Sequence, residues 1–200
     1  EYVPYTAIDR KGITGVTSAD IAAARAGGYV IKLIASGVKT ADGLDVSVAP
    51  TFVPVSDPLS GISGSFNAFR LHGDMVDDVM LTGRGAGARP TGSAIVSDVV
   101  YCALRTEPEY PPFAIGSADD KIRTVRAKKK YFFSVSGADV TAVEKAIGDL
   151  KTESVVLDLN SGRVEIFTAP VGKSDLIAAI DAVKKAVAGA SVGEVFGILE

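Results

Sequence analysis

Hydrophobic and polar positions along the chain form short runs that have the period of a strand or of a helix. In the first half, the Asp42-Gly43 dipeptide stands between two apolar runs and predicts a hairpin turn. His72-Gly73-Asp74 separates a second pair of such runs and predicts another turn. The strands expected here are residues 29–35, 44–53, 66–71 and 76–81.

A helix is predicted ahead of the first strand from the residues at its two ends. Thr17 is suited to the N-cap, and Asp20 occupies the capping-box position three residues later. The Gly27-Gly28 pair is expected to end the helix.

The second half follows a different order of elements. Asp139 and Ser174 are expected to cap two helices, and Asn160-Ser161-Gly162 is expected to form a hairpin turn. The strands expected here are residues 131–135, 154–159, 164–168 and 194–199. The resulting order β-α-β-β-α-β is the ferredoxin-like pattern. The predicted fold class is therefore α+β, with a sheet-rich first part and a ferredoxin-like second part.

A polar stretch with three prolines, residues 106–112, separates these two parts, and adjacent prolines disfavour helix. We therefore expect a first domain at residues 1–105, a linker at 106–130 and a second domain at 131–200.

Composition narrows the class of protein. The 200 residues are 47% hydrophobic, which is enough for a sizeable core, and the net charge of −3 favours neither nucleic acid nor an acidic membrane surface. Cys102, the only cysteine, is expected to be a buried, inert thiol in a reducing, cytoplasmic setting. No apolar run has the length of a membrane span and no signal peptide is visible. Because the first residue is Glu1, the chain is expected to derive from a longer protein.

The segment Gly83-Arg84-Gly85-Ala86-Gly87-Ala88-Arg89-Pro90-Thr91 is the strongest candidate for a binding site. It follows an apolar run at residues 79–81 and precedes a helix-like run at 93–100. Glycines allow a close approach of the backbone, and a helix start offers unpaired N–H groups. A ligand cradle and a tight structural turn both fit. The third glycine comes one position too early for a dinucleotide-binding fingerprint, and no second parallel strand follows.

Other candidate chemistry is weaker. His72 is the only histidine and no G-x-S-x-G motif accompanies it, so a hydrolytic triad is not indicated. Asp74, Asp77 and Asp78 match no dedicated metal loop. The basic run at residues 121–130 is more typical of a solvated linker and edge strand than of a nucleic-acid site.

Several motifs of the first half, taken together, resemble the later half of the catalytic region of homoserine dehydrogenase. Their order and spacing match this family over about half of the chain. The segments that carry the resemblance are Gly12–Ile21, Gly28–Ala35, Ala49–Pro54 with Asp57–Leu59, Phe66–Ala68 with Gly73-Asp74, Gly83–Gly87, Pro90–Ala94 and Ser97-Asp98.

The resemblance implies an oxidoreductase that interconverts L-aspartate 4-semialdehyde and L-homoserine with NADP or NAD, a step toward threonine and methionine. It also implies that Gly87, with Gly85 and Ala86, lies near the nicotinamide, and that the protein is a homodimer. The family's Rossmann domain and catalytic-lysine segment are absent from these residues. Neither Lys11 nor Lys32 matches that lysine, so this chain alone is expected to be inactive.

The second half lies where some members of this family carry an ACT domain, which is also ferredoxin-like. Its first turn, Ser136-Gly137-Ala138-Asp139, lacks the proline that ACT domains often have there. An ACT-like module that packs or dimerises is one expectation. The alternative function is a non-catalytic regulatory protein that binds an amino acid through this module.

Overall fold

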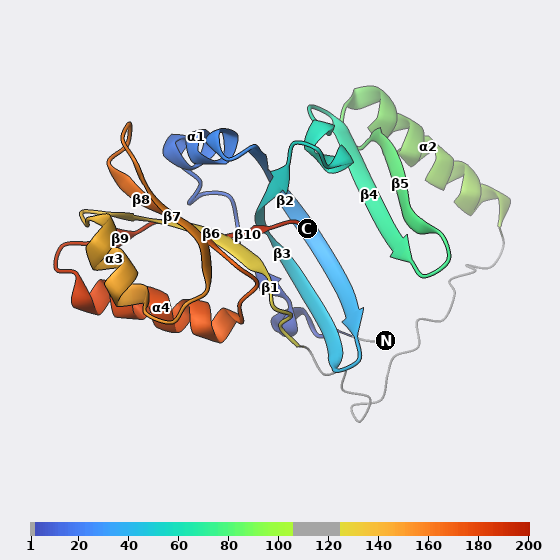
Figure 1. Ribbon diagram of the computed structural model, residues 1–200. Coiled ribbons are helices and arrows are strands. Elements are labelled where there is room, and N and C mark those ends of the chain that lie inside the picture. Colours follow the sequence, from blue (N-terminus) through green and yellow to red (C-terminus); the bar gives the residue numbers. More distant parts are fainter. Residues whose placement is uncertain (1–2, 106–124) are drawn as a thin grey trace. The chain divides into compact units, whose positions relative to one another are not determined.

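The computed structural model describes residues 3–105 and 125–200, and these fall into two compact units (Figure 1). Unit one comprises residues 3–55 and 125–200, and unit two comprises residues 56–105. Each unit contains both helix and strand, which confirms the α+β class.

Unit one is built on a mixed sheet whose strand order is β1-β3-β10-β6-β8-β7, with β2 paired to β3 and β9 paired to β6. β3 runs parallel to β1 and β10 and antiparallel to β2, whereas the pairs among β6, β7, β8 and β10 are antiparallel. The strands are β1 (Asp9–Arg10), β2 (Tyr29–Thr40), β3 (Gly43–Pro54), β6 (Lys130–Ser136), β7 (Thr152–Asp158), β8 (Arg163–Thr168), β9 (Ser191–Val192) and β10 (Phe196–Ile198).

The β2–β3 hairpin confirms the turn predicted at Asp42-Gly43. Thr40 pairs with Gly43, so that only Ala41 and Asp42 lie between the strands. Both strands are longer than the hydrophobic pattern predicted, since β2 continues through the mixed residues 36–40 and β3 extends by one residue at each end. A single 3-10 turn, η1 (Tyr5–Ala7), precedes β1.

Helix α1 (Ser18–Ala26) has the predicted ends. The Thr17 side chain accepts a hydrogen bond from the Asp20 backbone N–H at 3.2 Å, and the Asp20 carboxylate accepts one from the Thr17 N–H at 2.9 Å. Gly27 is the C-cap, and Gly28 follows it with φ +80°.

The second half has the predicted β-α-β-β-α-β order, with α3 (Val140–Ile147) and α4 (Lys173–Ala186) between its strands. The strands lie in the order β10-β6-β8-β7, which is the ferredoxin-like arrangement. Asp139 caps α3 as predicted, by accepting from the Ala142 N–H at 2.8 Å. The cap predicted at Ser174 is wrong. Helix α4 already begins at Lys173, and its N-cap, Gly172, has no side chain to accept a bond.

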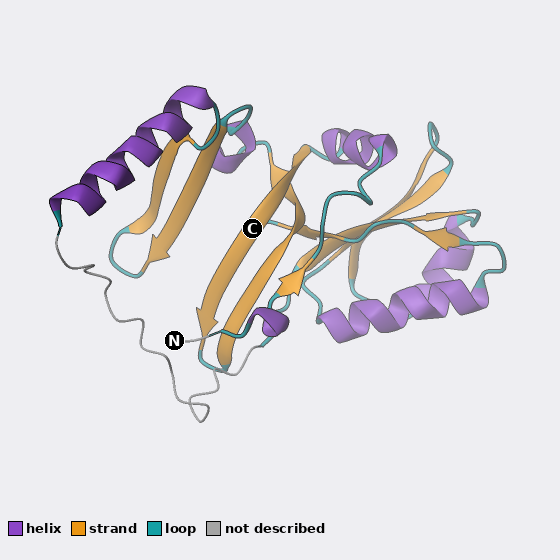
Figure 2. Ribbon diagram, turned by 180° about the vertical axis from the view of Figure 1, so that it is seen from behind, coloured by secondary structure: helices purple, strands orange, loops and turns teal. Residues whose placement is uncertain are grey.

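Two apolar clusters cover opposite faces of this sheet. Figures 1 and 2 show α3 and α4 on one face and α1 on the other. The larger cluster joins α3 and α4 to strand residues such as Phe133 and Val164. The smaller one packs Ala23 and Ala24 of α1 against Phe52 and Phe132, whose ring centroids are 4.6 Å apart.

Strand β10 joins the two parts of the chain that the sequence separated. Gly197 pairs with Thr51 of β3 on one side and with Tyr131 of β6 on the other. The predicted segments 1–105 and 131–200 thus share one sheet. Within the predicted linker 106–130, residues 106–124 lie outside the described structure, and the Val125 N–H donates to the Leu44 carbonyl at 3.1 Å.

Unit two contains a two-stranded antiparallel sheet, one α-helix and a 3-10 turn: η2 (Pro58–Gly61), β4 (Phe66–Gly73), β5 (Asp77–Arg84) and α2 (Ala88–Leu104). The strand predicted from residue 76 begins one residue later. The helix predicted from residue 93 begins at Ala88, because Pro90 fits the first helical turn, where no N–H is needed. Cys102 is exposed, not buried as predicted, since no residue of α2 is buried in unit two.

Among the described residues, no helix combines the length and the apolar character that crossing a membrane requires.

Candidate functional site

The glycine-rich segment forms the connection from β5 to α2 in unit two. Gly83 and Arg84 are the last residues of β5, Gly85 and Ala86 form the link, and Gly87 is the N-cap of α2. The structure therefore brings the three residues singled out from the sequence into one exposed connection at a helix start.

Gly85 is explained by packing within unit two. Its N–H donates to the Ser65 carbonyl at 2.8 Å, which extends the pairing of β4 with β5. A Cβ at this position would overlap the side-chain amide of Asn67. The absence of a side chain at Gly85 thus allows Asn67 to lie against the backbone.

Gly87 is different, because the space beside it is open. Its φ of +113° is a backbone conformation that disfavours residues with a side chain. A Cβ here would have one heavy atom within 4 Å, the Pro90 Cδ at 3.6 Å. The Gly87 carbonyl accepts from the Thr91 N–H at 3.1 Å, which begins the helix. Packing within the unit therefore does not account for an open glycine at this position.

The start of α2 offers hydrogen-bond donors to a ligand. Gly87 provides no side-chain cap, and within the described residues the N–H groups of Ala88 and Arg89 have no partner. The helix has 17 residues, and its aligned peptide dipoles favour negative charge at this end. The connection can hold an anionic or amide group through backbone contacts.

The segment itself contains no acid, base or nucleophile placed for chemistry. The Arg84 guanidinium lies 4.7 Å from the centre of the Phe66 ring and donates to the Ser65 hydroxyl at 2.9 Å. The fit to a nicotinamide cofactor is therefore that of one wall of a site, with an open glycine and free N–H groups but no acid–base side chain.

The remaining sequence candidates lie elsewhere or are engaged in other contacts. His72 is exposed, and its Nδ1 lies 2.8 Å from the Asp78 carboxylate. No group of three or more possible metal ligands occurs among the described residues. Lys32 lies within β2, and Lys11 directly follows β1.

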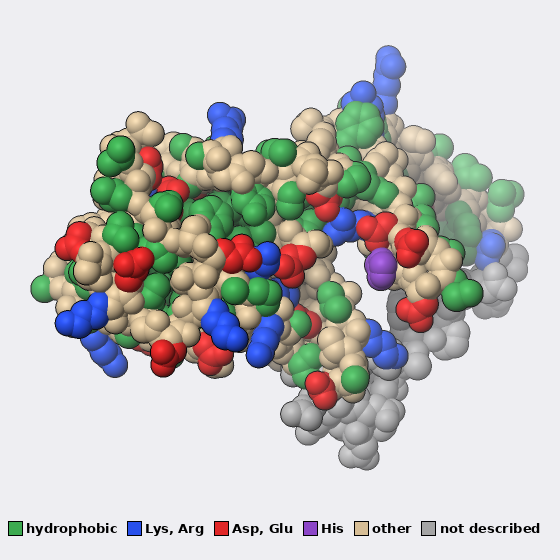
Figure 3. Space-filling model, in the orientation of Figure 1, with side chains coloured by type: hydrophobic (Ala, Val, Ile, Leu, Met, Phe, Trp, Pro, Cys, Tyr) green, Lys and Arg blue, Asp and Glu red, His purple; other side chains and the backbone are tan. Residues whose placement is uncertain are grey.

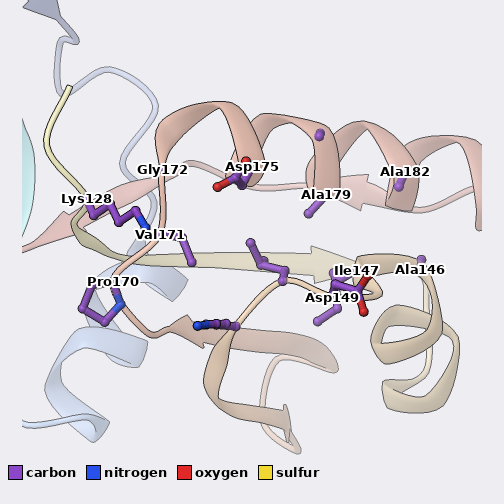
Figure 4. Close-up of a pocket in the computed structure, with 13 residues that line it drawn as sticks. Lys128, Ala146, Ile147, Asp149, Pro170, Val171, Gly172, Asp175, Ala179 and Ala182 are labelled. Carbon is purple, nitrogen blue, oxygen red and sulfur yellow. The ribbon is translucent and has the colours of Figure 1, made fainter. Parts of the chain in front are cut away.

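Unit one has a pocket of about 460 Å³ beside α4. Figure 4 shows Asp175 and Ala179 of α4 along one side and Ile147 and Asp149 at the end of α3, with Lys128 at the opposite end. Its lining is mostly apolar and rich in alanine, and it also contains Lys128, Asp149, Lys151 and Asp175.

A charged cluster in unit one was missed by the sequence interpretation. Asp45 of β3 has a side chain only 1% exposed, and its carboxylate lies 2.9 Å from the Lys129 ammonium. Asp45 has the same strand parity as Ser47, Ala49 and Thr51, so these side chains share one face of the sheet. The signal that could have revealed this cluster is the single carboxylate, Asp45, on a strand face whose other members are uncharged.

Comparison with known proteins agrees with the resemblance seen in the motifs. The comparisons place the sheet-rich first half and the glycine connection in a family of dehydrogenases. A family model described as homoserine dehydrogenase matches residues 1–100. The chain therefore belongs to the homoserine dehydrogenase family.

Individual relatives extend the match over most of the chain. It is 29% identical to a homoserine dehydrogenase of Neisseria gonorrhoeae over 198 residues, covering 90% of this chain and 46% of that protein. A Bacillus subtilis homoserine dehydrogenase is 40% identical over 90 residues, covering 45% of this chain and 21% of that protein. The chain spans about half the length of the first two curated relatives it matches.

Solved structures show the same relation. A crystal structure of Staphylococcus aureus homoserine dehydrogenase matches with a TM-score of 0.67 and 26% identity, covering 100% of this chain and 49% of that one. A homoserine dehydrogenase of Thiobacillus denitrificans matches with a TM-score of 0.76 at 22% identity over 98% of this chain and 48% of that one, which supports the fold. These relatives give no support to the alternative of a non-catalytic regulatory protein.

Proposed function

We propose that this chain is part of an enzyme that interconverts L-aspartate 4-semialdehyde and L-homoserine with NADP or NAD. The family match over residues 1–100, which includes the glycine connection, is the observation that carries the proposal. The activity would belong to a cytoplasmic enzyme of the route to threonine and methionine. The relatives support the reaction, since all of those named above are homoserine dehydrogenases.

In this proposal Gly87, with Gly85 and Ala86, forms the wall of the site beside the nicotinamide, the group that carries the hydride. Gly87 has open space where a side chain would stand, and the adjacent N–H groups are free within the described residues. Their task is to position a flat ring, which is how a protein assists a cofactor reaction without supplying its chemistry. Other parts of the full-length protein would bind the cofactor's phosphates and supply the catalytic lysine.

A homodimer is part of the same proposal. Unit two carries large apolar side chains that are more than 40% exposed on both of its strands and on α2, and exposed apolar surface on this scale marks a contact surface. They are Phe66, Phe69, Leu71, Val79, Leu81, Ile95, Val96, Val99, Val100, Tyr101 and Leu104. Light scattering of the full-length protein tests this, and a monomer at micromolar concentration would contradict it.

The site assignment is tested in the full-length protein with a matched pair of variants, Gly87→Ala and Gly64→Ala. Both glycines belong to unit two and have positive φ, +113° and +63°, so both variants strain the backbone. Neither added methyl group meets an atom closer than 3.6 Å. The two changes differ in their place relative to the proposed cofactor site and in backbone strain, because the Gly87 conformation, φ +113° and ψ 153°, is almost restricted to glycine.

We expect Gly87→Ala to raise the KM for NADPH or to lower kcat by about tenfold or more, because a misplaced ring loses its near-attack geometry. Gly64→Ala is expected to retain wild-type kinetics, with a smaller loss of thermal stability than Gly87→Ala. Equal kinetics in the two variants would refute the assignment of Gly87. Absence of homoserine oxidation in the wild-type full-length protein would refute the proposed reaction itself.

A further inference from the structure

Unit one contains a second cavity, which is separate from the glycine connection and is lined by charged side chains. Its volume is about 480 Å³. Its floor is the face of β2 and β3 that carries small residues, namely Ser36, Ser47, Ala49 and Thr51. We call it the charged cavity, after the cluster formed by Asp9, Lys11, Asp45, Arg126, Lys129 and Lys173 around Tyr131.

At one end of the charged cavity, two cations share one buried carboxylate. The Asp45 carboxylate lies 2.9 Å from the Lys129 ammonium and 3.7 Å from the Arg126 guanidinium. The remaining Arg126 contacts are to the neutral carbonyls of Val46 and Ala7, at 3.4 and 3.2 Å. Positive charge therefore exceeds negative charge here.

At the other end, the Lys173 ammonium pairs with Asp9, and the Lys11 ammonium pairs with Glu194. Burial raises the pKa of Asp9, but the hydrogen bond and charge of Lys173, with the charges of Arg126 and Lys129, lower it overall. Burial lowers the pKa of Lys11, and the nearby positive charge of Lys173 lowers it further. The ammonium groups of Lys11 and Lys173 thus repel each other.

The lining as a whole carries a surplus of positive charge. Five basic residues, Lys11, Arg126, Lys128, Lys129 and Lys173, line it together with three acidic residues, Asp9, Asp45 and Glu200, and the Glu194 partner of Lys11 reduces the surplus to one positive charge. The face drawn in Figure 3 otherwise shows acidic and basic side chains intermingled. A local surplus of positive charge beside an apolar wall favours an anion, because low polarity strengthens the attraction.

Free hydroxyl groups stand beside these cations. Ser36 and Ser47 lie directly opposite each other in the β2–β3 register and share the cavity floor. Within the described residues, neither these hydroxyls nor that of Tyr131 has a hydrogen-bond partner. Burial raises the pKa of the Tyr131 hydroxyl, and the charges of Asp45 and Asp9 raise it further, so it is held as a donor.

The apolar part of the lining comes from β2 and α4, with Ile34, Val38, Leu176, Ile177 and Ile180, and from the segment around β10, with Val195, Ile198 and Leu199. An apolar wall with a few convergent polar groups is the usual form of a small-molecule site. We propose that the charged cavity binds a small organic anion. Its phosphate or carboxylate head contacts Arg126, Lys173 and the Tyr131 hydroxyl, and its apolar body lies along the isoleucines.

The inference does not rest on the proposed enzyme activity, and its test measures binding alone. Full-length protein, saturated with NADPH to block any phosphate site for the cofactor, is titrated with phenyl phosphate, phenylacetate and benzyl alcohol. Calorimetry gives the affinity, and the isoleucine methyl NMR signals of Ile34, Ile177 and Ile180 give the location. We expect at least one of the two anions to bind and to shift these three signals, and benzyl alcohol to bind at least tenfold more weakly.

A phosphate-only result assigns the cavity to phosphate esters, and a phenylacetate-only result assigns it to carboxylates. Absence of binding by both anions, or equal binding of benzyl alcohol, would overturn the inference. Binding that leaves these three methyl signals unmoved would also overturn it.

Two lysine variants in α4 test whether Lys173 contacts the anion. Lys173→Met should weaken anion binding about tenfold or more, the usual cost of losing a charged hydrogen bond. Lys184→Met removes an exposed lysine further along α4 and should leave binding unchanged. The double variant Asp9→Asn, Lys173→Met removes the ion pair as a unit, so it should fold even if the single variant does not. Wild-type affinity in the folded double variant would contradict the assignment of Lys173.

Discussion

Arg163 of β8 donates a hydrogen bond to the carboxylate of Asp20 in α1 at 2.9 Å, although 143 positions separate the two residues. Asp20 is also the capping-box residue of α1, and its side chain is only 1% exposed. One carboxylate thus starts a helix of the first half and ties it to a strand of the second half.

Arg163→Met is expected to lower the free energy of unfolding by about 3 kcal/mol, because it leaves a buried carboxylate without its charged partner. Chemical unfolding followed by circular dichroism checks this. Arg25→Met, which removes an exposed arginine from the last turn of α1, is the control and should cost less than about 1 kcal/mol. Equal costs for the two variants would show that the pair contributes little.

Glu165 predicts a dependence of stability on pH. Burial raises the pKa of its carboxyl group above the ordinary 4.5, the charge of Asp158 raises it further, and Arg163 offsets part of this. A pKa raised by folding favours the native state below pH 4.5, and this contribution is lost as the pH rises through the native pKa. The stability of Glu165→Gln relative to the wild type should therefore increase between pH 4 and pH 7. Urea unfolding at both pH values measures the difference, and a constant or falling difference would contradict this account.

Asp139 and Ser174, which the sequence predicted as helix caps, should differ in their contribution to stability. Asp139→Ala should cost about 1 kcal/mol, since it removes the side chain that accepts from the Ala142 N–H. Ser174→Ala should cost close to nothing, because Ser174 lies inside α4, after its N-cap. Thermal unfolding of the two variants is the measurement, and a larger cost at Ser174 would restore the cap expected from the sequence.

The aromatic cluster between α1 and the sheet should dominate the stability of unit one. Phe132 is fully buried against Phe52, and Phe132→Ala is expected to cost about 3 to 5 kcal/mol through the cavity it leaves. Phe69→Ala is the matched control, since the Phe69 side chain of unit two is 61% exposed. Unfolding with denaturant should show a much smaller loss for Phe69→Ala, and comparable losses would mean that Phe69 is covered in solution.

Local signals in the sequence predicted most elements of this fold. Thr17 with Asp20, the Asp42-Gly43 turn and Asp139 each act through bonds within a few residues, and all three are confirmed. The predicted start of α2 was wrong, because Gly87 and Pro90 were interpreted as loop residues. In the structure Gly87 is the cap and Pro90 lies in the first turn.

Long-range relations could not be predicted in the same way. The pairing of Gly197 with both Thr51 and Tyr131 depends on where whole strands meet, and no local pattern encodes it. The charged cavity was missed for the same reason, since Lys11, Asp45 and Lys173 come from three separate elements. The glycine connection was found because its residues are contiguous, whereas the role of Gly87 beside a cofactor stays a prediction.

Strand β10 lies between β3 and β6, although it comes after both of them in the chain. Strand β3 can pair early with β2 and β1, but its edge at Thr51 and Phe52 stays unpaired until β10 emerges from the ribosome. At the usual pace of translation that delay is roughly seven to thirty seconds. An unpaired strand edge is open to aggregation during such an interval. The nascent chain is thus expected to benefit from chaperones until β10 is made.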